Sequence, residues 1–130
     1  CMAAAIDDAG LTPAEVDYVN AHATSTVLGD PAEAQALLRV FGEAQPPVSS
    51  TKSATGHALG AAAATELVFC LAMLEHGFIA PSLNLDDPGE EFAGLNLATE
   101  CTEAELGVVL SNSFGFGGTN ASLVVRRGED

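Results

Sequence analysis

The chain has 130 residues, of which 48% are hydrophobic and 17% charged, with four Lys and Arg against 18 Asp and Glu for a formal net charge of −14. This length fits one domain of ~100–200 residues, and the apolar fraction excludes a disordered chain because a core can form. A strongly acidic chain offers no basic surface to nucleic acid or to anionic membranes. We therefore expect neither partner.

The cysteines give no sign of a metal centre or of a secreted protein. Cys1, Cys70 and Cys101 are an odd number without a Cys-x-x-Cys pair, which favours reduced thiols in the cytoplasm. No basic segment followed by an apolar one opens the chain, so no secretory signal is expected. The longest apolar stretch, residues 58–74, is shorter than the ~20 residues a bilayer needs and contains Glu66, which predicts a core helix.

The chain opens on what reads as the end of a helix. Residues 2–9 predict an amphipathic helix that Gly10 closes, because glycine adopts a positive φ without a Cβ penalty. No Ser, Thr, Asp or Asn precedes this helix to cap it, and the first residue is Cys1. We expect from this that the sequence starts inside a helix and is a piece of a longer polypeptide.

Strands and helices then alternate. Residues 16–21 are rich in strand-forming residues and predict a short strand. Asp30 as N-cap and Pro31 at the first helical position predict a helix that runs to Phe41 and ends at Gly42, because the missing N–H of proline costs nothing there. Residues 48–50 suit an internal strand between two helices.

The strongest helix prediction covers residues 57–75, with His57 at its start and Gly77 beyond its end. Residues 58–64 are almost all Ala and Gly, and side chains this small let another backbone approach closely, so we expect this half to be buried. At a helix start the macrodipole disfavours the imidazolium form. The prediction for His57 is therefore a neutral imidazole that can donate a hydrogen bond.

The last third predicts a loop and three strands. Residues 81–91 form the loop, and its acidic run lacks the spacing of a calcium site, so no metal is expected. Residues 95–98, 107–110 and 121–125 predict strands, the last two separated by residues 111–120. Early alternation with two neighbouring late strands predicts an α/β fold, a mixed sheet with helices on its faces.

Three polar clusters follow predicted strands, where open α/β sheets place their ligand sites. They cover residues 20–26, 50–57 and 112–120. The first contains His22 and the second His57, so each histidine is a candidate for catalysis. Taken alone, His22 is also explained by a hydrogen bond to a nearby hydroxyl, and His57 by a helix start without function.

Two charged residues stand in apolar surroundings. Lys52 is the only lysine, in the otherwise uncharged stretch of residues 46–65, which favours a buried or site role over a surface one. Glu66 has alanines on one side and large apolar residues on the other. Desolvating an unpaired carboxylate costs several kcal/mol, so Glu66 needs a partner, and Lys52 is the obvious candidate.

The run from Gly115 to Gly118 differs from phosphate-binding loops. The last glycine of Gly-x-Gly-x-x-Gly falls on Asn120 and a strand follows, while the segment Lys52-Ser53 lacks the glycines of a Walker loop. We therefore expect no dinucleotide and no other cofactor. The glycines allow a mobile loop whose N–H groups approach a ligand, with two phenyl rings as gates, although a tight β-hairpin explains the segment equally well.

In this order, the three clusters make the chain resemble the C-terminal half of an elongating β-ketoacyl-acyl carrier protein synthase of the KAS II type, a condensing enzyme of the thiolase superfamily. The resemblance runs from Asp8-Ala9-Gly10-Leu11 to Asn120-Ala121-Ser122-Leu123. It implies a thiolase-like fold in which residues 1–130 are the C-terminal half and the N-terminal half is absent. In this family a cysteine thiolate takes the acyl chain, malonyl-carrier protein loses CO₂, and the carbanion attacks the acyl thioester, which elongates fatty acids in the cytoplasm.

By motif position, the resemblance assigns a role to residues of all three clusters. His22 and His57 would hydrogen-bond the malonyl thioester carbonyl and stabilise the enolate. Lys52 would tune His57, and Glu66 would join that polar network. Phe116 would gate the acyl pocket and give its backbone N–H to the oxyanion hole. Residues implied to support the malonyl site or to let the gate move are Thr24, Thr26, Thr55, Gly115, Gly117 and Gly118.

The nucleophile of the family has no match here. The family places its cysteine in an Ala-Cys-Ser elbow of the N-terminal half, and none of Cys1, Cys70 and Cys101 has such surroundings. Cys70 fits a small core residue and Cys101 a loop thiol. Ala23 stands where many relatives have glycine, which is a mild departure. Without the cysteine, we expect this chain alone to be inactive.

The expected partners are the acyl and malonyl forms of acyl carrier protein and the N-terminal half of the same enzyme, with a homodimer when complete. Because carrier proteins are usually acidic, the basic patch that meets them should lie mainly in the absent half. Two other functions remain open. One is a ketosynthase domain of a polyketide synthase, and the other is a thiolase-like fragment that binds or scaffolds a partner without chemistry.

Overall fold

The structure, a computed structural model, describes residues 1–128. Its strands are β1 (Tyr18–Asn20), β2 (Pro47–Ser49), β3 (Phe78–Ile79), β4 (Asn96–Leu97), β5 (Thr102–Glu103), β6 (Val108–Phe114) and β7 (Asn120–Arg126). Its helices are α1 (Met2–Asp8), α2 (Gly29–Phe41), α3 (Lys52–Thr55) and α4 (Ala62–His76), with short 3₁₀ turns η1 (Pro13–Glu15), η2 (Leu59–Ala61), η3 (Glu90–Phe92) and η4 (Phe116–Gly118).

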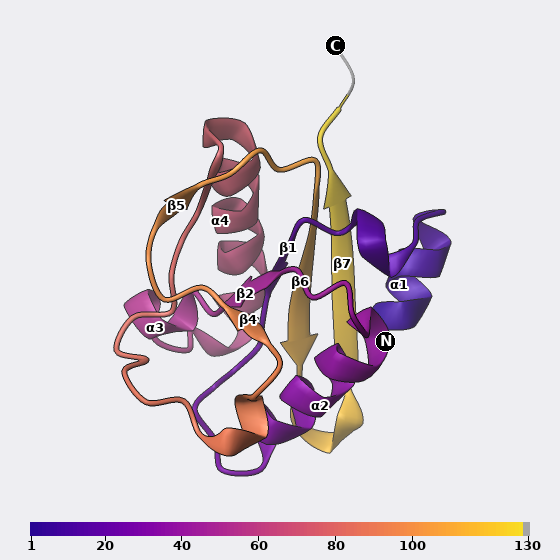
Figure 1. Cartoon of the computed structure of the whole chain (residues 1–130). Helices are drawn as coiled ribbons and strands as arrows, with labels where there is room; N and C mark the ends of the chain where they lie inside the picture. The colour runs from indigo at the N-terminus through magenta and orange to yellow at the C-terminus, as the bar shows by residue number, and fades with distance from the viewer. Residues whose placement is uncertain (129–130) are drawn as a thin grey trace.

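The strands form a mixed sheet in the order β4-β2-β1-β6-β7 (Figure 1). Strands β4, β2, β1 and β6 are parallel, and β7 pairs antiparallel with β6. The predicted α/β fold with a mixed sheet is thus confirmed. Asn20, the last residue of β1, lies in register with Ser49 of β2 and with Ser111 of β6. The segments that follow β1 and β2 therefore leave the sheet at the same end, where these parallel strands have their carboxyl ends.

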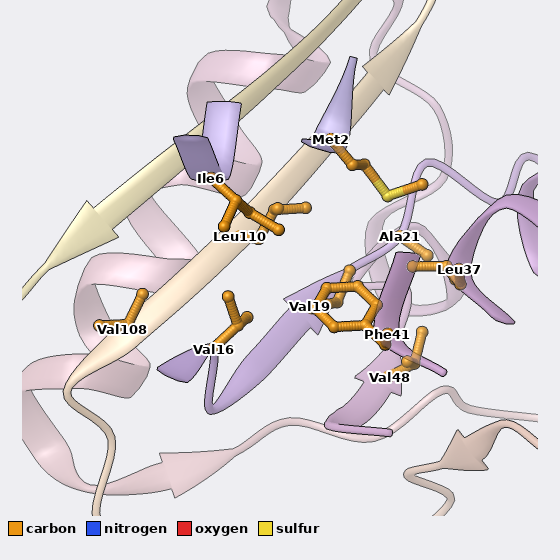
Figure 2. Packing of buried hydrophobic residues seen from close by; sticks show 10 residues of the cluster. All are labelled: Met2, Ile6, Val16, Val19, Ala21, Leu37, Phe41, Val48, Val108 and Leu110. Carbon is orange, nitrogen blue, oxygen red and sulfur yellow. The ribbon is translucent and has the colours of Figure 1, made fainter. Parts of the chain in front are cut away.

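One face of the sheet packs against α1 and α2. Side chains alternate between faces along a strand, and Val19, Val108 and Leu110 point to this side. Figure 2 shows this apolar cluster between the strands and the two helices. Its buried members are Met2, Ile6, Val16, Val19, Ala21, Leu37, Phe41, Val48, Val108 and Leu110.

The opposite face packs against α4, which lies on the other side of the sheet from α1 (Figure 1). Tyr18 of β1 and Val109 of β6 contribute to this second cluster, as the alternation requires. Cys70, Met73 and Leu74 of α4 cover them. The fold thus has three layers, with α1 and α2, the sheet, and α4 in that order.

Helix α4 begins later than the sequence predicts. Residues 57–61 are not α-helical, and η2 precedes α4, which starts at Ala62. Positive φ angles at Gly56 (73°) and Leu59 (52°) turn the chain between α3 and α4. His57 therefore does not occupy the first turn of α4, and the helix dipole gives no reason for a neutral imidazole.

The expectation that residues 58–64 are buried is wrong for the described chain. Only Ala62 is buried in this stretch, while Ala61 and Ala64 are exposed. These two alanines share one face of the helix with Val68 and Leu71, at 60% and 46% exposure. The outer face of α4 is therefore apolar and uncovered.

The stretch Leu59–His76 is apolar enough, with a mean hydropathy of 1.4, and long enough to cross a membrane by length and composition alone. The core helix of a globular protein passes the same test. The inner face of α4 packs on the sheet, and Glu66 lies buried in the middle of the helix. These contacts support the predicted core helix.

Other boundaries also differ from the predictions. Asp30 stands in the first turn of α2 and is not its N-cap, which is Leu28, because the Asp30 carboxylate bonds to the preceding loop. Much of the segment 111–120, which the sequence predicts to lie between two strands, is itself strand, because β6 continues to Phe114. Its pairing with β7 gives the backbone groups of these polar residues hydrogen-bond partners. Helix α3 and the antiparallel pair of β3 and β5 have no clear signal in the sequence.

Candidate active site

The two histidines singled out from the sequence lie together. His22 comes two residues after β1, and His57 follows α3, which itself follows β2. Their ring centroids are 5.5 Å apart with the planes at 89°, an edge-to-face arrangement. Both rings line a cavity of about 410 Å³, here called the histidine cavity. Its other lining residues are Leu59, Ala62, Ala63, Ser113, Phe114, Gly115, Phe116, Thr119 and Ala121.

One hydrogen bond indicates which ring nitrogen of His57 carries the proton in the neutral form. The backbone N–H of Leu59 donates to Nδ1 of His57 over 3.3 Å. An accepting Nδ1 carries no proton, so the neutral ring has its proton on Nε2. The predicted hydrogen-bond donor is thus available, although the cause is this turn and not a helix start.

His22 is held neutral by its surroundings. Partial burial is the main factor that lowers its pKa below the ordinary 6.5, and the charge of Lys52 lowers it further. Its Nδ1 is buried without a hydrogen-bond partner among the described residues. The ring lies 5.9 Å from that of Phe114, with an interplanar angle of 58°. Both imidazole rings therefore face the histidine cavity.

Lys52 and Glu66 form the ion pair that the sequence suggests. Nζ of Lys52, at the start of α3, contacts Oε1 of Glu66 in α4, with side-chain exposures of 4% and 3%. A buried pair is stable only while both charges remain, because each alone would be desolvated without compensation. The pair also joins the site to α4.

Glu33 of α2 is a site residue that the sequence analysis missed. Its Oε1 accepts hydrogen bonds from the backbone N–H of His22 (2.9 Å) and from Nδ2 of Asn112 (3.0 Å), and its Oε2 accepts from the N–H of Ala23 (2.8 Å). Burial raises the pKa of Glu33, while these donors oppose the rise. The available signal was the spacing of Asp30 and Glu33, which places both carboxylates on one face of a helix that starts beside the His22 cluster.

A second cavity of about 400 Å³, here called the α2 cavity, also reaches His57 and Lys52. Of the three predicted threonines, Thr24 lines it. Thr26 and Thr55 line neither cavity: Oγ1 of Thr26 accepts the N–H of Gly29 (3.1 Å), and Oγ1 of Thr55 donates to backbone carbonyls. These two threonines stabilise local turns.

The loop predicted to be a gate closes the hairpin of β6 and β7 and lines the histidine cavity through Gly115 and Phe116. The N–H of Gly115 donates to the carbonyl of Thr119 over 2.7 Å, which fixes the base of the loop. Gly117 and Gly118 have φ angles of 77° and 84°, which only glycine adopts without strain. The Phe116 side chain is fully exposed. The predicted hairpin is thus present, and a mobile loop with phenyl rings as gates stays a prediction.

None of the cysteines lines either cavity. Cys1 and Cys101 are exposed, and Cys70 lies buried in the cluster under α4, as a small core residue should. Burial raises the pKa of Cys70 to about 11, so its thiol stays protonated at neutral pH.

Comparison with known proteins decides the family. Residues 1–86, more than half of the chain, match the family described as "Beta-ketoacyl synthase, C-terminal domain". The chain belongs to the β-ketoacyl synthase family. The fold class and family predicted from the three clusters are therefore confirmed.

Curated relatives of this ketosynthase chain are 3-oxoacyl-[acyl-carrier-protein] synthases. It is 56% identical to synthase 1 of Escherichia coli over 115 residues, which cover 88% of the chain and 28% of that relative. It is 46% identical to synthase 2 of Coxiella burnetii over 129 residues, which cover 98% of the chain and 31% of that relative. The chain thus spans about 30% of the length of these relatives, and both types of synthase are similar to it.

A solved structure shares the fold of this ketosynthase chain closely. A type II polyketide ketosynthase in complex with its acyl carrier protein aligns with a TM-score of 0.93 and 33% identity over 99% of the chain and 32% of that structure. The agreement covers both layers of helices, so the chain has the arrangement of a ketosynthase C-terminal half.

Proposed function

We propose that this chain supplies the decarboxylating half of the active site of a β-ketoacyl-acyl carrier protein synthase in fatty acid elongation. The observation that supports it most is the pair of histidines, with ring centroids 5.5 Å apart, that face one cavity beside a glycine loop. Two hydrogen-bond donors at this separation suit one carbonyl oxygen that becomes an enolate oxygen.

The proposed reaction has two steps on this side of the enzyme. The C–C bond between the malonyl carboxylate and its α-carbon breaks, CO₂ leaves, and the electron pair moves to the enolate of the carrier-bound thioester. The α-carbon then forms a C–C bond with the acyl carbonyl, and the cysteine thiolate leaves as its thioester bond breaks. The product is a 3-oxoacyl-carrier protein.

His57 and His22 have distinct parts in this scheme. The proton on Nε2 of His57 hydrogen-bonds the thioester oxygen, because the turn at Leu59 occupies Nδ1. His22 donates the second hydrogen bond. Burial lowers the pKa of His22, the charge of Lys52 lowers it further, and the pair with Glu66 holds that charge in place. Neutral donors suit an oxyanion that forms and disappears within one turnover, because neither ring must give up its proton.

The loop beside the cavity is proposed to gate the acyl chain. The Phe116 side chain stands free of the fold, and the left-handed glycines Gly117 and Gly118 allow the loop to change conformation. The N–H of Phe116 is proposed as an oxyanion-hole donor to the acyl thioester, and Gly115 as the hinge. Thr24 is proposed to line the path of the malonyl group, with Thr26 and Thr55 in supporting turns.

The nucleophilic cysteine is proposed to come from the N-terminal half of the complete enzyme. The chain spans 28% of the length of its Escherichia coli relative, and none of its own thiols is placed to react with a substrate in either cavity. The uncovered apolar face of α4, with Val68 and Leu71, supports an obligate partner at that face. The complete enzyme is proposed to work in the cytoplasm as a homodimer.

Acyl carrier protein is the proposed donor of both substrates. A ketosynthase of this fold is known in complex with its carrier protein. This chain carries a net charge of −14, which repels an acidic carrier. The docking surface is therefore proposed to lie mainly on the N-terminal half.

A polyketide substrate is the second candidate, supported by the 33% identity to a polyketide ketosynthase structure. The 56% identity to a 3-oxoacyl-carrier protein synthase favours fatty acids. A non-catalytic scaffold would need neither two histidines at one cavity nor a buried ion pair beside them, so the site argues against this function.

The test is to join this chain to the N-terminal part of the Escherichia coli relative, in place of the matching C-terminal segment, and to assay malonyl-carrier protein condensation. We expect 3-oxoacyl product, and a fall of about 100-fold with His57→Ala because one oxyanion donor is lost. His76→Ala, an exposed histidine at the end of α4, is the matched control. Unchanged turnover in His57→Ala would exclude the proposed role.

A further inference from the structure

The loop that carries His22 has a strained backbone. Ala23 has a φ of 23° and Ser25 a φ of 63°, a region that residues with a Cβ seldom adopt. Such conformations persist only where the surrounding structure enforces them. Some neighbour must therefore hold this loop.

Two carboxylates of α2 provide that restraint. Glu33 accepts the backbone N–H groups of His22 and Ala23. Asp30, one turn earlier, accepts those of Ser25 (3.1 Å) and Thr26 (3.0 Å). The two side chains together bind four N–H groups of one loop. Carboxylates suit this task because both oxygens accept hydrogen bonds and neither donates.

Glu33 also connects the loop to the gate hairpin. Nδ2 of Asn112, in β6, donates to Glu33, and Oδ1 of Asn112 accepts the hydroxyl of Ser122 (2.8 Å) in β7. Glu33 and Asn112 are both buried. One carboxylate thus joins the histidine loop to the two strands that carry the glycine loop.

The imidazole of His22 has no such support of its own, because its buried Nδ1 lacks a partner among residues 1–128. We propose that Asp30 and Glu33 are positioning residues, whose hydrogen bonds hold the strained backbone of residues 22–26 so that His22 faces His57. This inference rests on the proposed function, since it matters for catalysis only if the two histidines share a substrate. It assigns α2 the task of setting the geometry of the site.

The test compares two steps in the joined protein described above: transfer of the acyl group to cysteine, and condensation with malonyl-carrier protein. Glu33→Gln keeps the volume but turns an N–H donor toward a backbone N–H. We expect it to lower kcat of condensation by about 100-fold, the effect of a misplaced group, while acyl transfer stays near wild type. Tm should fall modestly, because one buried N–H loses its acceptor. Asp30→Asn should act in the same direction by a smaller factor, because Asp30 is less buried. Glu43→Gln, an exposed carboxylate just beyond α2, is the matched control.

A rescue variant separates positioning from a general role in folding. Ala23→Gly accepts the positive φ without strain, so in the Glu33→Gln background it should restore part of the lost condensation rate. Wild-type condensation in Glu33→Gln, or an equal loss of acyl transfer and condensation, would overturn the assignment of Glu33. Wild-type condensation in Asp30→Asn would overturn that of Asp30.

Hydrogen exchange distinguishes failure of this inference from failure of the proposed function. The amides of His22 and Ala23 should exchange slowly in the wild-type protein and markedly faster in Glu33→Gln, whether or not the protein condenses substrates. Unchanged exchange would reject the restraint itself. Absence of condensation in the wild-type protein, with faster exchange in the variant, would reject the proposed function alone.

Discussion

Lys52 and Glu66 form an ion pair inside the protein, between the first residue of α3 and the second turn of α4. The pair is close enough to act on both histidines, since Lys52 lines the α2 cavity together with His57 and its charge lowers the pKa of His22. One contact therefore influences folding and the electrostatics of the site, and the two effects can be separated.

The first prediction concerns stability. Lys52→Met or Glu66→Leu alone leaves a buried charge without its partner and should cost about 3–5 kcal/mol of unfolding free energy. The double variant Lys52→Met, Glu66→Leu removes both charges and should recover most of that loss. Urea unfolding of the joined protein measures all three, and condensation should remain low in the double variant. A double variant as unstable as the sum of the single ones would show that the pair does not act as a unit.

The second prediction concerns the pKa of His22. The positive charge of Lys52 disfavours the imidazolium form, so Lys52→Met should raise the pKa of His22 toward the ordinary 6.5. Titration of the imidazole by NMR measures the change. Arg39→Met removes a charge elsewhere on the chain, at the end of α2, and serves as the control. An equal rise in both variants would point to net charge and not to the contact.

A third prediction follows from the lowered pKa of His22 itself. Well above pH 6.5, the ring is neutral in the folded and unfolded states, so its shift contributes nothing to the pH dependence there. As pH falls below 6.5, the unfolded state takes up the proton first, and the folded state loses stability. His22→Gln removes this contribution, so its unfolding free energy should fall less than that of the wild type between pH 7 and pH 5. A steeper fall in His22→Gln would contradict the lowered pKa.

The gate loop supports a fourth prediction. In the variants Gly117→Ala and Gly118→Ala, the new alanine must adopt a positive φ, which costs about 1 kcal/mol and stiffens the loop. Gly60→Ala is the control, because its φ is not positive and its added Cβ meets no atom within 4 Å. We expect a lower rate of acyl transfer for both loop variants and no change for Gly60→Ala, measured by single-turnover acylation. Equal rates in all three would argue against a mobile gate.

Much of the fold was predictable because strong local signals coincide with it. Pro31 and Gly42 predict both ends of α2 to within two residues. The isolated charges of Lys52 and Glu66 in apolar surroundings correctly predict that the two side chains pair. Both histidine clusters follow parallel strands, so their meeting at one sheet edge could be expected from the order of elements.

The errors arise where tertiary contacts override local preference. Residues 57–61 contain good helix formers, yet positive φ angles at Gly56 and Leu59 separate α3 from α4. No sequence pattern predicts a positive φ at a leucine. Glu33 was overlooked because a carboxylate on a helix is ordinary in a sequence. Its importance lies in three donors that come from two distant segments, a pairing that only the folded chain brings about.

The last prediction concerns the uncovered face of α4. Leu71 is 46% exposed in this chain, so Leu71→Lys should leave the stability of residues 1–130 by themselves almost unchanged. If the N-terminal half covers this face, the same change in the joined protein places a charge in an apolar interface and should cost several kcal/mol. Leu83→Lys, at 48% exposure on the loop after β3, is the matched control. Urea unfolding of both proteins measures the effect, and equal stability of wild-type and Leu71→Lys joined proteins would show that another surface of this chain meets the N-terminal half.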